Sequence, residues 1–139
     1  MNISEKIVNK MFDQDAFSQR MGIEIISVSK GYCQLKMKVR KEMTNGFDIA
    51  HGGIAYSIAD SCLAFAANTD GVQSISIETS ISHTKKVMSG DTLIAQAKEI
   101  NKGSKTALYY ITITNQDNIE IAHFKGTVFR TAKEWFPNK

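Results

Sequence analysis

The sequence concentrates its candidate chemistry where two glycines follow a histidine at the start of an apolar segment. The order is His51-Gly52-Gly53, and the alanine-rich residues 54–67 that follow carry a single charge, Asp60. The first amides of a helix have no acceptor within the helix and lie at the positive end of its dipole, so they attract a ligand's oxygen. Glycine leaves these amides open to close approach. The pattern predicts a site that stabilises the oxyanion of an acyl-transfer reaction, with a simple tight turn as the alternative.

Asp60 is the second candidate group. A carboxylate in an apolar helix loses hydration, so its pKa is expected to be raised. Seven residues separate Gly53 from Asp60, which places both on one helix face but about 10.5 Å apart along the axis. If both groups act on one substrate, Asp60 must come from a second, antiparallel copy of the helix, which predicts a two-fold dimer. The alternative is a solvated Asp60, or one that bonds a backbone group.

The other histidines and the lysines give weaker indications. His83 and His123 fall within strand patterns and are expected to be structural. Three isolated histidines without i,i+4 spacing predict no metal site. Four lysines near strand ends and turns are either solvated loop charges or a clamp that binds a ligand's phosphates by charge-assisted hydrogen bonds. These lysines are Lys85, Lys86, Lys102 and Lys105.

The elements that must position these groups alternate between helix and strand patterns. Residues 3–20 have apolar side chains at roughly helical spacing and predict an amphipathic first helix. Residues 54–67 predict a helix that is apolar on nearly every face and therefore surrounded by protein. Six β-rich segments predict strands at residues 23–28, 32–39, 73–84, 91–100, 105–115 and 119–130. This order favours a single α+β domain over residues 1–139, with an antiparallel sheet wrapped around one central helix.

Length and composition exclude several classes of protein. The chain has 139 residues, of which 42% are hydrophobic and 22% charged, which indicates one globular domain and not a disordered chain. It has no long apolar run and no basic-then-apolar opening, so we expect neither a transmembrane helix nor a secretory signal. The net charge of +3 is too small to predict nucleic-acid binding. Cys33 and Cys62 stand far apart, which predicts no disulfide framework and favours a cytoplasmic location.

A longer motif gives a family resemblance. The segment NGFDIAHGG at residues 45–53, followed by SIAD at residues 57–60, resembles the signature of hot-dog-fold thioesterases of the phenylacetic-acid-degradation (PaaI-like) group. The likeness covers nearly the whole chain. It implies a hot-dog fold with an additional N-terminal helix. It also implies hydrolysis of acyl-coenzyme A thioesters, often aromatic ones such as hydroxyphenylacetyl-CoA, with no metal or other cofactor.

The resemblance also implies roles for the residues at matching positions. The Gly53 amide polarises the thioester carbonyl, Asn45 and His51 shape the loop and assist, and Gly52 contacts the substrate. Asp60 of the neighbouring subunit attacks the carbonyl directly or activates a water molecule. The family forms homodimers with active sites at the subunit interface, commonly assembled as dimers of dimers. No nucleic-acid or membrane partner is implied.

Two other functions are compatible with this fold. A hydratase or dehydratase needs a histidine and carboxylate arrangement with a nearby proline, which residues 48–51 match poorly. A non-catalytic acyl-CoA sensor would keep the pocket without the carboxylate, so the presence of Asp60 favours the enzyme.

Overall fold

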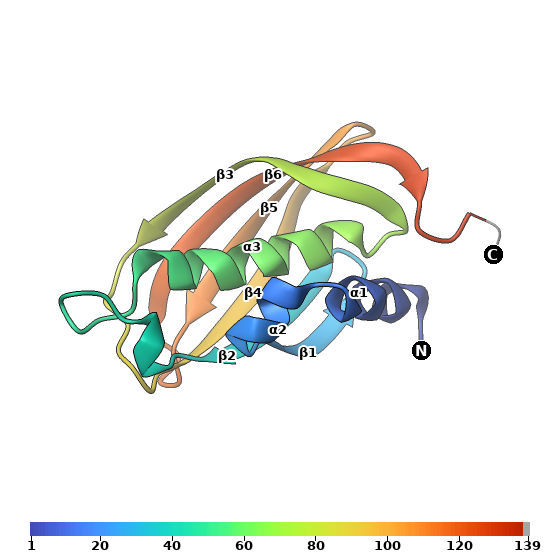
Figure 1. The fold of residues 1–139 in the computed structure, drawn as a ribbon. Coiled ribbons are helices and arrows are strands. Elements are labelled where there is room, and N and C mark those ends of the chain that lie inside the picture. Colours follow the sequence, from blue (N-terminus) through green and yellow to red (C-terminus); the bar gives the residue numbers. More distant parts are fainter. Residues whose placement is uncertain (138–139) are drawn as a thin grey trace.

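Figure 1 shows a curved sheet with one long helix lying across it. The computed structural model describes residues 1–137. Its helices are α1 (Ile3–Asp13), α2 (Ala16–Met21) and α3 (Gly52–Asn68), and a short 3₁₀ turn spans Lys41–Met43. Its strands are β1 (Glu24–Ser29), β2 (Tyr32–Lys38), β3 (Val72–His83), β4 (Thr92–Lys102), β5 (Thr106–Thr114) and β6 (Glu120–Glu134).

The six strands form one antiparallel sheet in the order β1-β2-β4-β5-β6-β3. Strands β4, β5 and β6 follow one another as a meander. Strand β3 precedes them in sequence but pairs with the far side of β6, so α3 and β3 together cross from one side of the sheet to the other. β1 and β3 are therefore the edge strands. The predicted α+β fold, an antiparallel sheet wrapped around one helix, is confirmed.

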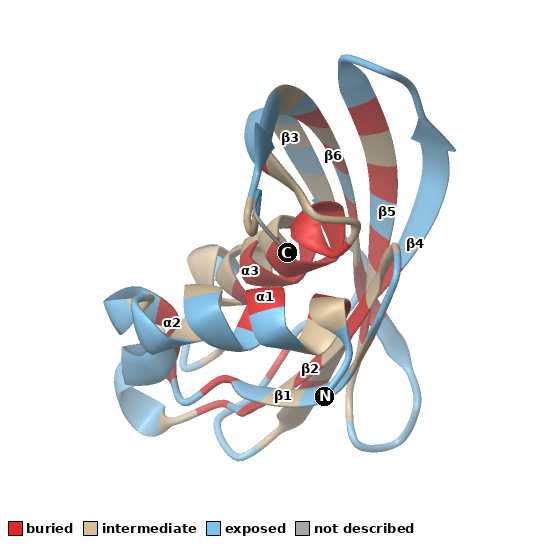
Figure 2. Cartoon of the chain, turned by 90° about the vertical axis from the view of Figure 1, so that its right-hand side faces the viewer, coloured by how far each residue is buried: buried red, intermediate tan, exposed pale blue. Residues whose placement is uncertain are grey.

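The core lies between α3 and the hollow face of the sheet (Figure 2). Apolar residues alternate along the strands, and those facing α3 are buried, among them Leu35, Tyr109, Ile111 and Phe124. Each large apolar side chain buried in this way stabilises the fold by about 1.5–3 kcal/mol. One contact is unusually close, because a Cβ atom built on Gly126 of β6 would lie 2.5 Å from Cδ2 of Leu63 on α3. Any larger residue at this position would require the buried Leu63 side chain to shift.

The N-terminal segment folds as two helices, which corrects the single helix predicted for residues 3–20. Helix α1 ends at Asp13, and the Asp15 side chain then accepts a hydrogen bond from the Ser18 amide at 2.9 Å as the N-cap of α2. An aspartate that bonds the backbone in this way competes with continued helix and starts a new one. Apolar periodicity is preserved across the break, which is why the spacing alone predicted one element. Within residues 1–137, no helix is both long and apolar enough to cross a membrane.

Candidate active site

The first two amides of α3 differ, because that of Gly53 is hydrogen-bonded and that of Gly52 is open. His51 is the N-cap of the helix, and its Nδ1 accepts a hydrogen bond from the Gly53 amide at 2.9 Å. Because Nδ1 is the acceptor, a neutral His51 carries its proton on Nε2. The Gly52 amide has no acceptor within hydrogen-bonding distance among residues 1–137. The structure therefore leaves the Gly52 amide free at the position where we had expected the Gly53 amide to act.

The loop before the helix is held by its own polar groups. The Asn45 side chain accepts a hydrogen bond from the Phe47 amide at 2.9 Å, and the Asn45 amide donates to the Ile49 carbonyl at 2.8 Å. Asp48 has a φ of 66°, a left-handed conformation that a short polar residue tolerates. The His51 amide donates to the Met43 carbonyl at 2.8 Å. These contacts fix the backbone of the turn that presents His51 and Gly52.

A cavity of about 160 Å³ opens at this end of α3. It brings together five residues singled out from the sequence: Asn45, His51, Gly52, Lys85 and Lys86. It also includes His83, which we had expected to be structural. The His83 ring lies beside the open glycine, since a Cβ atom on Gly52 would be 3.6 Å from His83 Nε2. No pattern in the sequence indicates this contact, because only the folded sheet shows that β3 ends beside the start of α3.

Lys102 and Lys105 do not line this cavity. Lys102 lies at the end of β4, near the C-terminal end of α3, where its Nζ is 3.3 Å from the Asp70 carboxylate. Lys105 is in the same region, where its carbonyl accepts a hydrogen bond from the Arg130 amide at 2.7 Å. Helix α3 has 17 residues, so about 25 Å separates its two ends. Within one protomer the four lysines therefore fall into two distant pairs.

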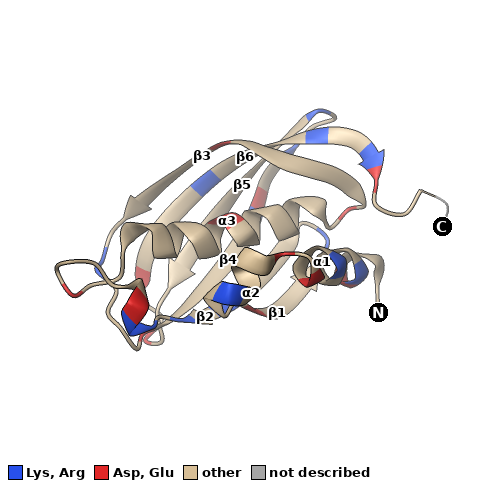
Figure 3. Ribbon diagram, in the orientation of Figure 1, with Lys and Arg blue, Asp and Glu red and all other residues tan. Residues whose placement is uncertain are grey.

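Asp60 lies in the middle of α3 and is the only charged residue of that helix (Figure 3). Its carboxylate has no hydrogen-bond partner among residues 1–137. Burial raises the pKa of this carboxyl above its ordinary value of 3.8, and the negative charge of Asp15 raises it further. Asp60 is thus a partly desolvated carboxylate that no other group among residues 1–137 neutralises. Such a carboxylate is suited to act as a base or a nucleophile.

One stripe of α3 is left partly uncovered by the rest of the protomer. The stripe consists of Gly53, Ser57, Asp60 and Ala64, which follow helical spacing and are intermediate in exposure. Most other residues of the helix are buried. On one side of this stripe the Tyr56 hydroxyl is hydrogen-bonded to Thr79 of the edge strand β3. The helix was expected to be surrounded by protein, and this stripe is the face on which one protomer does not provide the cover.

Comparison with known proteins identifies the family. The thioesterase superfamily matches residues 47–122. A putative esterase of Archaeoglobus fulgidus is 37% identical over 96% of this chain and 86% of its own length. The acyl-coenzyme A thioesterase PaaI of Escherichia coli is 35% identical over 86% of each chain. This chain belongs to the thioesterase superfamily.

Solved structures agree with this assignment. The structure of the E. coli PaaI protein superposes with a TM-score of 0.92 and 32% identity, covering 94% of this chain and 95% of that one. A Streptococcus mutans protein bound to acetyl CoA superposes with a TM-score of 0.78 and 27% identity, covering 81% of this chain and 90% of that one. The hot-dog fold and the resemblance to the PaaI-like group are confirmed. The predicted enzyme class is confirmed as well, since this chain is a thioester hydrolase.

Proposed function

We propose that this thioesterase hydrolyses acyl-coenzyme A at two equivalent sites, each built from both protomers of a two-fold homodimer. One observation carries the proposal: an open amide at Gly52 and an unpartnered carboxylate at Asp60 lie on the same helix, whose uncovered stripe includes Asp60. About 12 Å along the axis separates them, too far for one thioester group to contact both. In a second, antiparallel copy of α3, the amide of each helix lies beside the carboxylate of the other.

The amides at the start of α3 polarise the thioester carbonyl in this proposal. The resemblance assigns this role to Gly53, but the Gly53 amide reaches a carbonyl oxygen only after the His51 ring turns away from it. The Gly52 amide needs no such change, so we assign the first contact with the developing oxyanion to Gly52. Asn45 and His51 act by holding the turn that presents this amide.

Asp60 of the second protomer supplies the attacking group by one of two routes. As a general base it takes a proton from water, and the water oxygen bonds to the carbonyl carbon. The carbon–sulfur bond then breaks, and the proton passes from Asp60 to the departing thiolate. As a nucleophile, the Asp60 oxygen itself bonds to the carbonyl carbon, the thiolate departs, and water hydrolyses the resulting anhydride. Detection of an acyl group on Asp60 by mass spectrometry in a single turnover distinguishes the second route from the first.

Lysines anchor the coenzyme A phosphates in the proposed complex. Lys85 and Lys86 line the cavity beside Gly52 and supply donors for charge-assisted hydrogen bonds. Lys102 and Lys105 lie at the other end of α3 and serve only as contacts from the second protomer, whose α3 runs in the opposite direction. Support for a coenzyme A substrate comes from the E. coli acyl-coenzyme A thioesterase and from the S. mutans protein bound to acetyl CoA.

An aromatic acyl group, such as hydroxyphenylacetyl, is the preferred substrate that we propose. Its support is the similarity to the E. coli protein of the phenylacetic acid degradation operon. Release of free thiol from a panel of aromatic and aliphatic acyl-CoAs tests both the reaction and the preference. Asp60→Asn should reduce turnover by about 10²- to 10⁴-fold while the fold stays intact. No thiol release from any ester would favour the acyl-CoA sensor, and unchanged turnover in the variant would remove Asp60 from the mechanism.

The antiparallel register of the two helices has its own test. If Gly52 or Gly53 faces Asp60 of the second copy, the two-fold axis passes close to residues 56 and 57. Two copies of Ser57→Cys then lie within about 3 Å of each other along the helix axes, and a short thiol-specific cross-linker should join them. Ala64→Cys is the matched control on the same stripe, because its two copies are more than about 20 Å apart. Efficient linking of Ala64→Cys with none at Ser57→Cys would contradict the register.

The proposal extends to assembly and location. We propose that two dimers associate through the outer face of the sheet, where Ile75 of β3 and Phe129 of β6 are paired and both exposed. The reaction as written uses no metal and no organic cofactor, since coenzyme A is part of the substrate. A cytoplasmic location is in keeping with Cys33 and Cys62, which are both free thiols and both buried.

A further inference from the structure

The N-terminal end of α2 places a second carboxylate near Asp60. Asp15 accepts two hydrogen bonds from Ser18, from its amide at 2.9 Å and from its hydroxyl at 2.6 Å. The Ser18 hydroxyl lies 2.8 Å from the hydroxyl of Ser61, which directly follows Asp60 on α3. Because the Ser18 proton is donated to Asp15, the Ser61 hydroxyl donates to Ser18. An unbroken chain of hydrogen bonds thus runs from Asp15 to the residue beside Asp60.

Burial makes this chain a fixed connection between the two helices. Ser18 is fully buried and Ser61 is 9% exposed. Buried hydroxyls without partners are costly, so Ser61 depends on Ser18 for its hydrogen bond, and Ser18 in turn donates to Asp15. Helix α2 has only six residues and is too short to be stable without contacts to its neighbours. The chain therefore fixes where α2, and with it the Asp15 carboxylate, lies relative to α3.

The surroundings of Asp60 contain few other charges. Asp60 is the only charged residue of α3, and none of the buried side chains among residues 1–137 is charged. On the N-terminal helices, Asp13 and Arg20 are exposed to solvent, where their fields are screened. Asp15 is the charged group whose field raises the pKa of Asp60, in addition to the effect of burial.

We propose that Asp15 is a positioning residue for Asp60, which holds α2 against α3 through Ser18 and directs a negative charge at the Asp60 carboxylate. This inference rests on the proposed function, in which the ionised Asp60 reacts. The like charge makes Asp60 a more basic carboxylate, and a more basic group is the better proton acceptor or nucleophile when it is ionised. The arrangement also raises the pH below which Asp60 is protonated and inactive.

Asp15→Asn separates the charge from the structure. Asparagine is as good an N-cap as aspartate. Its oxygen accepts from the Ser18 amide, and its NH2 group takes the place of the second carboxylate oxygen and donates to the Ser18 hydroxyl, which then donates to Ser61, so α2 should remain in place. Removal of the charge should lower the pH at which kcat/KM falls on the acid side. Asp13→Asn is the matched control, because it removes the same charge from an exposed position two residues away. It should leave the acid side of the profile where it is in the unaltered protein.

A direct titration makes the test independent of catalysis. The carbon-13 signal of the Asp60 carboxyl, assigned by its absence from Asp60→Asn, should titrate at lower pH in Asp15→Asn than in Asp13→Asn or the unaltered protein. Coincident titrations in all three proteins would overturn the role of Asp15, as would equal shifts in both variants. If the unaltered protein hydrolyses no thioester, the proposed function fails, while the titration still decides whether Asp15 acts on Asp60.

Discussion

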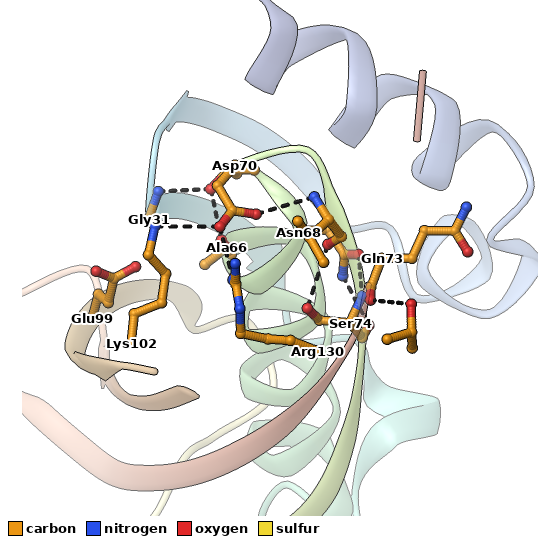
Figure 4. Close-up of polar contacts among 12 residues, drawn as sticks. Gly31, Ala66, Asn68, Asp70, Gln73, Ser74, Glu99, Lys102 and Arg130 are labelled. Atoms are coloured by element: carbon orange, nitrogen blue, oxygen red, sulfur yellow. Dashed lines mark hydrogen bonds and ion pairs between the residues drawn. The ribbon is translucent and has the colours of Figure 1, made fainter. Parts of the chain in front are cut away.

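The two ends of α3 differ in whether their polar groups have hydrogen-bond partners. At the C-terminal end, Asp70 binds Arg130 at 2.7 Å and Lys102 at 3.3 Å (Figure 4). Asn68 accepts from the Ser74 amide and donates to the Ser74 carbonyl. At the other end, the Gly52 amide has no acceptor among residues 1–137, and the Asp60 carboxylate in mid-helix has no hydrogen-bond partner there.

This difference suits the C-terminal end of α3 to stabilising the fold, and it leaves the N-terminal half available for the reaction that we propose. Buried polar groups that satisfy one another hold the helix end to the sheet. Burial alone would raise the pKa of Asp70, but hydrogen bonds from Arg130, the Val72 amide and Lys102 hold it below its ordinary value. Polar groups left open on a folded protein remain available to a ligand, and those of α3 are the groups to which we assign the reaction with a thioester. Arg130 Nε is the exception at the satisfied end, since it is buried without a partner.

Among changes that compare the two ends of α3, the largest effect should come from removing the Gly52 amide hydrogen at the N-terminal end. Gly52→Pro deletes the amide hydrogen at the first helical position, where proline is readily accommodated. His51 before it already has an extended ψ of 141°, which proline requires. We expect kcat to fall by about 10²- to 10³-fold with little change in stability, because one oxyanion donor is lost. Gly52→Ala keeps the amide, and its Cβ makes only an ordinary contact with His83. An equal loss in both variants would mean that bulk, not the amide, matters.

A change at the satisfied end should affect stability and leave turnover nearly unchanged. Arg130→Met keeps most of the side-chain stem but removes the hydrogen bond to Asp70. We expect the free energy of unfolding, measured with urea, to fall by about 2 kcal/mol, since a charged hydrogen bond is lost. The variant Asp70→Asn and the double variant complete a cycle that isolates the pair. A loss of kcat comparable to that of Gly52→Pro would contradict the division between the two ends.

The lysines should divide in the same way, with smaller effects. Lys85→Ala and Lys86→Ala should raise KM for acyl-CoA several-fold and change kcat little, because they remove ground-state anchoring of phosphates. Lys102→Ala removes an ion pair with Asp70 and should lower stability by about 0.5–1 kcal/mol, in addition to raising KM through loss of the contact proposed from the second protomer. Steady-state kinetics and urea unfolding on the same preparations give both quantities. A fall in kcat alone at Lys85 or Lys86 would argue against anchoring.

The smallest effects should appear as opposite pH dependences of stability. The pKa of Asp70 is lowered by folding, so its contribution is present above 3.8 and is lost as the pH falls through the lower folded value. The pKa of Asp60 is raised by folding, so protonation of Asp60 stabilises the fold as the pH falls towards 3.8. Unfolding experiments across this range should show the first dependence vanish in Asp70→Asn and the second in Asp60→Asn. Unchanged profiles in both variants would refute these assignments.

The sequence predicted the fold well where periodicity is strong. The apolar run at residues 54–67 identifies α3, because a helix without a polar face must lie inside a protein. The prediction of one helix over residues 3–20 was wrong at residues 14–15. There Asp15 accepts a hydrogen bond from the Ser18 amide and starts a second helix, although the apolar spacing remains helical. Local hydrogen bonding by one side chain decided that boundary, and hydrophobic spacing does not record it.

The sequence predicted only some of the residues of the candidate site, whereas it predicted nearly all elements of the fold. Asn45, His51 and Gly52 lie together because they are close in sequence. The sequence did not indicate that His83 lines the cavity, and it did not separate Lys102 from Lys85. Both errors arise because each strand carries the chain from one end of α3 to the other. An 11-residue strand such as β4 covers about 36 Å, so residues near in sequence lie at opposite ends of the helix. The choice between the Gly52 and Gly53 amides depended on the orientation of the His51 ring, which spacing does not reveal.

Gly126 on β6 links the packing of the sheet to the position of Asp60 on α3. The missing side chain on β6 lets Leu63 sit directly on the strand, and Leu63 is three residues from Asp60 on the same rigid helix. The depth at which α3 rests in the sheet therefore sets how far Asp60 projects from the sheet. A methyl group added at residue 126 would collide with the Leu63 side chain. Replacing this glycine to stiffen the strand should therefore shift Leu63 and the helix that carries Asp60, and in the dimer that we propose it would misalign both reaction centres.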